Sequence, residues 1–263
     1  MTTNPPAGRL LLIPNALDLG TALVPLEDVL PMAAIRTAAA LGHWVVEDAR
    51  SARMFLKRVD AIVPLAQALQ ATQVVELPRP QKGGHPPARP AAGASAVDPL
   101  PALLAPARDG HDIGLLSEAG LPGVADPGAA LVAAAHAEGL AVQVLSGPSS
   151  ITLALAASGL NGQSFVFHGY LPSDAAARGA RLRELEAASR RLQQTQVFIE
   201  TPYRNGALLA ALLSGLAPTT RLAVSCGLTL ADGWNLCLPV AAWRTRGVQM
   251  PQKVPAVFSL LAG

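Results

Sequence analysis

The chain has 263 residues, of which 51% are hydrophobic and 14% are charged. Intrinsic disorder of the whole chain is excluded, because disordered chains combine low hydrophobicity with high charge. The length exceeds that of an average domain and favours two α/β lobes. The formal net charge of +2 neither demands nor excludes a nucleic-acid partner.

Several classes of protein are disfavoured by residue spacing. Cys226 and Cys237 and the scattered histidines show no spacing typical of a zinc site, and two cysteines make no disulfide framework. We therefore expect no metal. No basic segment followed by an apolar run opens the chain, and no apolar stretch is long enough to span a membrane. The expected location is the cytoplasm.

Short aliphatic runs alternate with helical patterns through the first half of the chain. Strands are expected at 9–13, 43–47, 74–77, 112–116 and 141–145, and helices at 31–41, 52–58 and 127–138. This alternation predicts a parallel sheet with helices on its faces. Between 78 and 101 the composition shifts to Pro, Gly, Ala and Ser, which predicts a surface loop.

The order of patterns changes after Gly147. Helices are expected at 149–157, 175–192 and 205–213, strands at 164–167, 196–199, 221–225 and 257–261, and a hairpin over 227–238. The helix at 175–192 is amphipathic and carries five arginines, at 178, 181, 183, 190 and 191. We therefore predict an N-terminal α/β lobe over 8–147 with a parallel sheet, and a C-terminal α/β lobe over 148–263 with a mixed sheet.

Polar or glycine-rich segments follow five of the predicted strands, at 14–20, 47–50, 117–128, 146–150 and 200–204. In open parallel sheets, ligands bind beyond the carboxyl ends of the strands, so these loops predict one binding cleft. Glycines at 120, 123 and 128 allow the longest loop to turn tightly and to approach a ligand closely.

The ends of these loops carry helix-start signals. Asp126 followed by Pro127 fits a helix N-cap and a first-turn proline, which is the structural interpretation of this carboxylate. The segment 146–150 offers hydroxyl and amide groups at a second helix start. No Gly-Lys-Ser/Thr sequence follows it, so a P-loop that hydrolyses ATP is disfavoured.

Five segments resemble the tetrapyrrole methylase superfamily. They are Leu-Ser-Glu-Ala-Gly-Leu-Pro-Gly-Val-Ala-Asp-Pro-Gly at 116–128, Ser-Gly-Pro-Ser-Ser at 146–150, Phe-His-Gly-Tyr-Leu-Pro at 167–172, Glu-Asp-Ala-Arg at 47–50 and Phe-Ile-Glu-Thr-Pro-Tyr-Arg at 198–204. Within the superfamily they are most similar to the ribosomal RNA small subunit methyltransferase I group, which methylates a cytidine ribose 2′-hydroxyl in 16S rRNA. The resemblance runs in consistent order along the chain.

This resemblance implies two α/β lobes with S-adenosylmethionine (SAM) in the cleft between them. It implies a SAM-dependent methyltransferase, with 16S rRNA or the 30S subunit as a partner and a homodimer as the assembly. The residues that it places at the cofactor are Ser117, Glu118, Ala119, Gly120, Val124, Asp126, Ser149 and Ser150.

Transfer of a methyl group from a sulfonium is an in-line displacement, so positioning does most of the catalytic work. A ribose hydroxyl benefits from a general base, for which Asp48 and Glu200 are the candidates. Arg50 is a catalytic candidate for contact with a phosphate or carboxylate. Candidates for substrate binding are Glu47, Tyr203 and Arg204. The structural alternative is that Glu47 pairs with Arg50 and Glu200 with Arg204 as ion pairs.

The segments on the substrate side depart from the superfamily pattern. The first loop is Pro-Asn-Ala-Leu-Asp-Leu at 14–19, where the family has Thr-Pro-Ile-Gly-Asn-Leu, and the segment 225–230 lacks the family's arginine, glutamate and lysine. Two alternatives therefore stay open. The first is a methyltransferase that acts on a tetrapyrrole or another small molecule, and the second is a SAM-binding protein that has lost catalysis.

Overall fold

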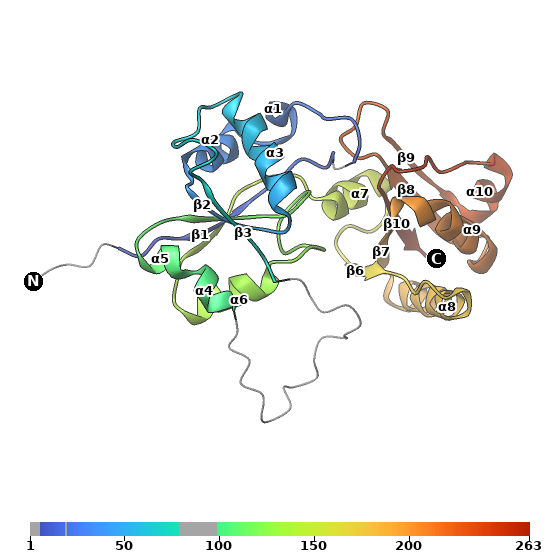
Figure 1. Cartoon of the computed structure of the whole chain (residues 1–263). Helices are drawn as coiled ribbons and strands as arrows, with labels where there is room; N and C mark the ends of the chain where they lie inside the picture. The colour runs from blue at the N-terminus through green and yellow to red at the C-terminus, as the bar shows by residue number, and fades with distance from the viewer. Residues whose placement is uncertain (1–5, 19, 79–98) are drawn as a thin grey trace, which may run out of the picture. The chain divides into compact units, whose positions relative to one another are not determined.

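The computed structural model describes residues 6–18, 20–78 and 99–263 (Figure 1). The chain divides into two compact units: Pro25–Pro148 with the residues up to Ala16, and Ser149–Gly263 with Leu17–Val24. Each unit contains one five-stranded sheet. The predicted α/β class is confirmed.

All five strands of the first sheet are parallel. In spatial order they are β3 (Gln73–Glu76), β2 (His43–Val46), β4 (Ile113–Leu116), β1 (Leu10–Ile13) and β5 (Val142–Val144). β4 and β1 lie inside the sheet with helices over both faces, which explains why neither strand contains a polar side chain. The strands predicted in this half of the chain are all present.

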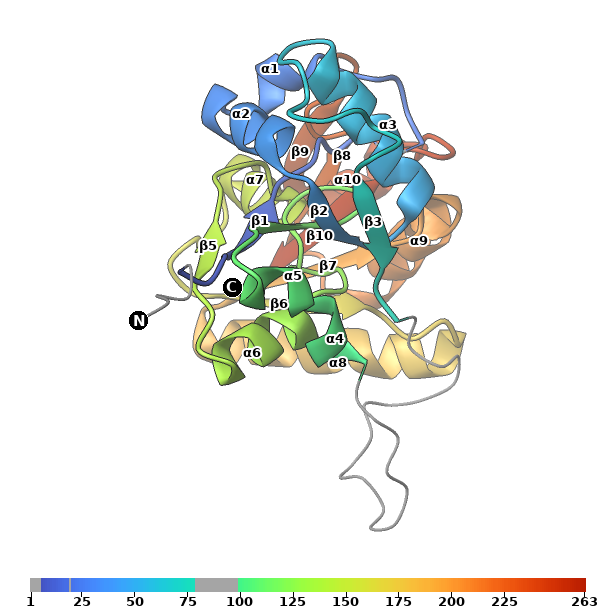
Figure 2. The same cartoon turned by 60° about the vertical axis from the view of Figure 1, so that its left-hand side comes forward.

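Helices cover both faces of this sheet (Figures 1 and 2). On one face are α1 (Leu26–Val29), α2 (Met32–Ala40) and α3 (Ala49–Asp60), and on the other are α4 (Leu100–Leu103), α5 (Ala105–Arg108) and α6 (Ala129–Ala137). α3 begins earlier than the predicted 52–58, because the carboxylate of Asp48 accepts a hydrogen bond from the Ser51 N–H and caps the helix. The predicted loop 78–101 lies almost entirely outside the described residues, and its last two positions belong to α4.

The second sheet is mixed, in the order β6 (Phe165–Tyr170), β7 (Thr195–Glu200), β10 (Ala256–Leu261), β8 (Arg221–Cys226) and β9 (Trp234–Pro239). Only β6 and β7 pair in parallel. The last strand of the chain therefore lies in the centre of its sheet. It pairs with β7 on one side and with β8 on the other, and its side chains are buried on both faces because helices pack on both faces of the sheet.

Helices also cover both faces of the second sheet. α8 (Ala175–Leu192), α9 (Asn205–Gly215) and α10 (Val240–Arg246) pack on one face, around Phe198 and Phe258, whose rings stack with centroids 6.1 Å apart. α7 (Ser150–Ser158) packs its Ile151 and Leu155 against the other face. Within the described ranges, no helix has both the length and the apolarity needed to cross a membrane.

Two local predictions are wrong. The hairpin expected over 227–238 is formed by β8 and β9, and residues 227–233 only connect these strands. Asp126 does not cap α6, because Gly128 occupies the N-cap position with a φ of 129° and the helix begins at Ala129. A glycine can adopt this φ at little cost, so the chain turns into the helix two residues later than the Asp-Pro pair suggests.

Candidate functional site

Asn15 joins two loops at the carboxyl edge of the first sheet. Its N–H donates to the Gly120 carbonyl (2.9 Å), and its own carbonyl accepts from the Gly120 N–H (3.2 Å). Its side-chain Nδ2 donates to the carbonyl oxygens of Ser117 (3.2 Å) and Glu118 (2.9 Å). Asn15 is buried, so each of these bonds is shielded from water. The protein itself therefore fixes the start of the loop 117–128, where the resemblance places the cofactor.

Three carboxylates lie near this edge: Glu47 after β2, and Glu118 and Asp126 in the loop after β4. The Oε2 atom of Glu47 accepts a hydrogen bond from the Glu118 N–H at 3.1 Å. Burial, reinforced by the negative charges of Glu47 and Glu118, raises the pKa of Asp126 to about 7. The concentration of negative charge favours a cationic ligand over an anionic one at this position.

Ser117 lies directly after β4 and is 2% exposed. Its hydroxyl has no hydrogen-bond partner among the residues that the structure describes. A buried hydroxyl without a partner costs on the order of 1–3 kcal/mol, and such groups in native proteins are commonly satisfied by a ligand or a water molecule. The orphaned hydroxyl therefore supports the prediction that a polar ligand contacts this loop.

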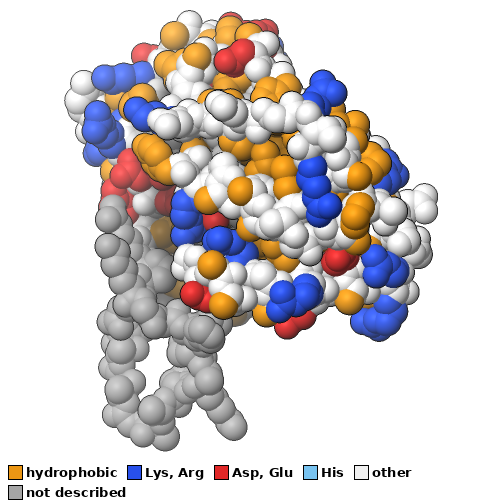
Figure 3. Space-filling model, turned by 90° about the vertical axis from the view of Figure 1, so that its right-hand side faces the viewer, with side chains coloured by type: hydrophobic (Ala, Val, Ile, Leu, Met, Phe, Trp, Pro, Cys, Tyr) orange, Lys and Arg blue, Asp and Glu red, His pale blue; other side chains and the backbone are white. Residues whose placement is uncertain are grey.

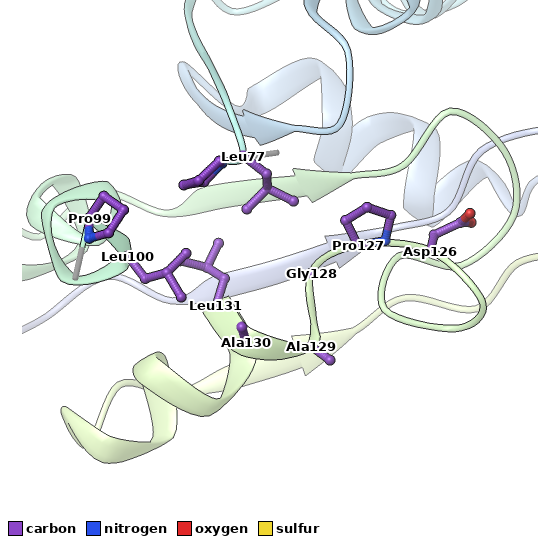
Figure 4. A pocket seen from close by; sticks show the side chains of 10 residues that line it. Leu77, Pro99, Leu100, Asp126, Pro127, Gly128, Ala129, Ala130 and Leu131 are labelled. Carbon is purple, nitrogen blue, oxygen red and sulfur yellow. The ribbon is translucent and has the colours of Figure 1, made fainter. Parts of the chain in front are cut away.

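An apolar cavity of about 400 Å³ adjoins the same loop. Figure 4 shows that Leu77, Leu100 and Leu131 face one another across it, while the carboxylate of Asp126 points away from these leucines. Pro78 and Pro99 also line the cavity, together with Pro127 and its neighbours at the start of α6. An apolar hollow beside a cluster of carboxylates suits a ligand that has both an apolar part and a positive charge.

The loop after β2 places Asp48 and Arg50 at the start of α3. Asp48 Oδ1 caps the helix through the Ser51 N–H at 2.8 Å, and Arg50 is exposed in the first turn. The ion pair between Glu47 and Arg50, which the sequence left as an alternative, is not found among the described residues. Glu47 accepts a hydrogen bond from the Glu118 N–H. Asp48 and Arg50 keep their predicted roles as proposals.

In the second unit, Glu200, Tyr203 and Arg204 follow β7. The ion pair that sequence reasoning left as an alternative is present, with Arg204 Nη2 at 2.6 Å from Glu200 Oε1. Glu200 is buried, and the same oxygen also accepts from Arg204 Nε (3.0 Å) and from the Thr201 N–H (2.7 Å). Because these bonds all use Oε1, Oε2 is the oxygen of Glu200 that retains capacity to accept a proton. Tyr203 is 76% exposed.

The predicted cofactor residues fall into two sets, one in each unit. Ser117, Glu118, Ala119, Gly120, Val124 and Asp126 share one loop of the first unit. Ser149 and Ser150 start α7 in the second unit. Ser149 occupies the N-cap position of α7, but its hydroxyl does not make the capping hydrogen bond. That hydroxyl is therefore not committed to its own helix.

Sequence reasoning missed two features of the first unit, the bonds of Asn15 and the close approach at Gly147. A Cβ atom at Gly147 would lie 2.1 Å from the Cβ atom of Pro14. The loops after β1 and β5 thus approach too closely for any side chain at this position. The available signal was weak: an asparagine directly after a strand and a glycine before a proline are both common in loops.

The chain is a two-unit α/β protein, with a five-stranded parallel sheet in the first unit and a mixed sheet in the second. An acidic, glycine-rich loop follows β4 at the carboxyl edge of the parallel sheet. Residues 49–233 match the family model of tetrapyrrole (corrin/porphyrin) methylases. The chain belongs to the tetrapyrrole methylase family, which confirms the resemblance inferred from its motifs.

Curated relatives carry the name ribosomal RNA small subunit methyltransferase I. The protein of Mesorhizobium japonicum is 37% identical over 129 residues, or 49% of this chain and 42% of the relative. That of Mycobacterium bovis is 45% identical over 108 residues, or 41% of this chain and 36% of the relative. The chain thus spans about two fifths of the length of these relatives.

A solved structure shows the same fold. The crystal structure of uroporphyrin-III C-methyltransferase from Thermus thermophilus, complexed with S-adenosylhomocysteine, matches with a TM-score of 0.50 and 19% identity. The match covers 97% of each chain. At 19% identity, this similarity shows a shared fold and nothing more.

We expect Asp126→Asn to stabilise the protein increasingly as the pH rises. Its folded-state pKa of about 7 lies above the unfolded value, so the wild type loses stability between about pH 4 and pH 7, where the unfolded chain has released a proton that the folded state still holds. The difference between the unfolding free energies of the variant and the wild type should grow by about 1–2 kcal/mol from pH 5 to pH 8, a value reduced to allow for the partial exposure of this side chain. Urea denaturation at both pH values measures this gain, and a pH-independent difference would contradict it.

Proposed function

We propose that this chain is a SAM-dependent methyltransferase that modifies 16S rRNA, at a cytidine ribose 2′-hydroxyl. The observation that carries the proposal is the 37–45% identity to relatives named for methylation of small-subunit ribosomal RNA. The likeness to a uroporphyrin methyltransferase, at 19% identity, supports the fold and gives no comparable support to a tetrapyrrole acceptor. The proposed setting is a cytoplasmic homodimer that contacts RNA or the 30S subunit.

The residues at the carboxyl edge of the first sheet fit SAM. The sulfonium and ammonium groups of SAM are cations, which the carboxylates of Glu118 and Asp126 would attract. The Ser117 hydroxyl, which lacks a partner among the described residues, would gain one. Ala119, Gly120 and Val124 complete this loop, and Ser149 and Ser150 at the start of α7 are assigned to the cofactor as in the sequence prediction. Bound SAM would supply an electrophilic methyl group.

Activation of the acceptor hydroxyl is assigned to Glu200 or Asp48. Glu200 is favoured, because its Oε2 atom makes none of the hydrogen bonds that hold its Oε1 atom to Arg204 and Thr201. A buried carboxylate with one oxygen held and the other available is suited to take a proton from a hydroxyl. Arg50, Arg204, Tyr203 and Glu47 are assigned to contacts with the acceptor.

The test has two stages. Calorimetric titration with SAM should show binding, and ATP serves as the control ligand that should not bind. Incubation with 30S subunits and SAM labelled at the methyl group should then place label in 16S rRNA, at a ribose after nuclease digestion. Absence of SAM binding would overturn the proposal. Label in a small molecule of a cell extract, with none in rRNA, would support the small-molecule alternative, and binding without turnover would support the loss of catalysis.

A further inference from the structure

A groove of about 640 Å³ runs along α3 beside the end of β3. α3 buries one face, with Ala52, Phe55, Leu56 and Val59, against the first sheet. The exposed side presents Arg50, Arg53 and Lys57 to the groove. Positions three and four apart on a helix lie on one side of it, so the three cations form one stripe, about 10 Å long along the helix axis.

The three cations of this stripe have no ion-pair partner in the part of the chain that the structure describes. Arg50 lies in the first helical turn, at the positive end of the helix dipole, where the carboxylate of the N-cap residue Asp48 offsets part of that charge. Cations held on one side of a helix without a fixed ion-pair partner suggest selection for an anionic ligand.

Local carboxylates do not supply that anion. Asp48 and Glu76 also line the groove, but each accepts a hydrogen bond from the backbone at the start of α3. Asp48 accepts from the Ser51 N–H at 2.8 Å, and Glu76 accepts from the Ala49 N–H at 2.9 Å. These two bonds take up N–H groups of the first turn. An external anion would therefore meet the side chains of the stripe, and not the amide groups at the helix terminus.

The basic side chains on one face of the molecule form several separate groups. On the face drawn in Figure 3, Lys and Arg side chains lie in separate groups, with hydrophobic and uncharged atoms between them. The distribution of Lys and Arg side chains on this face therefore does not by itself identify an RNA-binding surface. The stripe on α3 is distinguished by its concave setting and by its start at the loop after β2, which carries Glu47 and Asp48 of the candidate site.

We propose that the groove along α3 binds the phosphate backbone of the RNA acceptor, through Arg50, Arg53 and Lys57. This inference rests on the proposed function and names the surface that holds its substrate. Flexible cations without fixed partners bind a polyanion by releasing its condensed counterions. Met54, which is 50% exposed and lines the same groove, offers an apolar contact to a ribose or a base.

The test compares two charge-reversal variants of the full chain. Arg53→Glu combined with Lys57→Glu removes two cations from the groove. Arg183→Glu combined with Arg191→Glu makes the same change in net charge on α8, at exposed positions of the second unit. Binding of poly(U) RNA is measured by filter retention between about 50 and 200 mM salt. The SAM affinity of each variant is measured in parallel.

The groove variant should bind poly(U) at least about tenfold more weakly than the wild type. The slope of the logarithm of its RNA affinity against the logarithm of the salt concentration should be smaller in magnitude by about 1.4, because two phosphate contacts are lost and each contributes about 0.7 for a single strand. Its SAM affinity should match that of the wild type. The α8 variant should keep most of the RNA affinity and the full salt slope.

Equal losses in both variants would overturn the inference, because they would reflect net charge alone. Wild-type binding by the groove variant would also overturn it. Displacement of poly(U) by polyglutamate at equal charge concentration would overturn the assignment to RNA. If the wild type instead binds SAM but neither poly(U) nor 30S subunits, the proposed function itself fails, so the two failures are distinguishable.

Discussion

Replacement of Gly147 by alanine is expected to lower the free energy of unfolding by about 3 kcal/mol. The added methyl group would lie 2.1 Å from the Cβ atom and 2.5 Å from the Cγ atom of Pro14. A proline ring cannot rotate away, so the backbone of the loops after β1 and β5 must separate. Because both loops lie at the carboxyl edge of the first sheet, we expect SAM affinity to fall as well. Urea denaturation and calorimetry measure the two effects.

Gly206→Ala is the matched control for this substitution. Gly206 lies in α9, and apart from its chain neighbours and the backbone of its own helix, no atom of the described residues comes within 4 Å of an added Cβ. Alanine at an unobstructed helical position stabilises by roughly 0.5–1 kcal/mol, because glycine loses more conformational freedom on folding. The two variants should therefore shift stability in opposite directions. Equal stability of Gly147→Ala and the wild type would show that these loops separate at no cost.

Glu200→Gln is expected to slow methyl transfer by about 100-fold or more, in the range typical for loss of a general base. The amide keeps the shape of the side chain and an oxygen for the bonds from Arg204 and Thr201, but it cannot take a proton. Asp48→Asn should leave the rate within about threefold of the wild type, and it should leave the fold intact, because asparagine caps a helix about as well as aspartate. Single-turnover rates with labelled SAM compare the two variants.

Two further measurements make this comparison decisive. The melting temperature and the SAM affinity of each variant should match those of the wild type, so that a lower rate reflects chemistry and not folding or cofactor binding. A 100-fold loss in Asp48→Asn with a normal rate in Glu200→Gln would transfer the proton-accepting role to Asp48. Normal rates in both would show that neither carboxylate takes the proton.

The strands of the first sheet and the long helix α8 were predictable because their signals are local. β1 and β4 are short aliphatic runs, and α8 has the helical pattern over the whole of Ala175–Leu192. The motif at 116–128 likewise predicted the family, since loops that approach a ligand closely restrict residue type at each position. Such signals need no knowledge of what packs against the segment.

Other features were not predictable, because they depend on partners far away in the chain. Asn15 contacts Ser117 and Glu118 from more than 100 positions away. The pKa of Asp126 depends on burial and on Glu47, which lies on another strand end.

The sequence by itself therefore determined the α/β class, most of the elements and the family, because hydrophobic periodicity and ligand-contacting loops are recorded position by position. Only the tertiary structure decided which loops are held together and where β10 inserts in its sheet. These properties arise from contacts between residues distant in the chain, and a linear pattern does not specify such contacts.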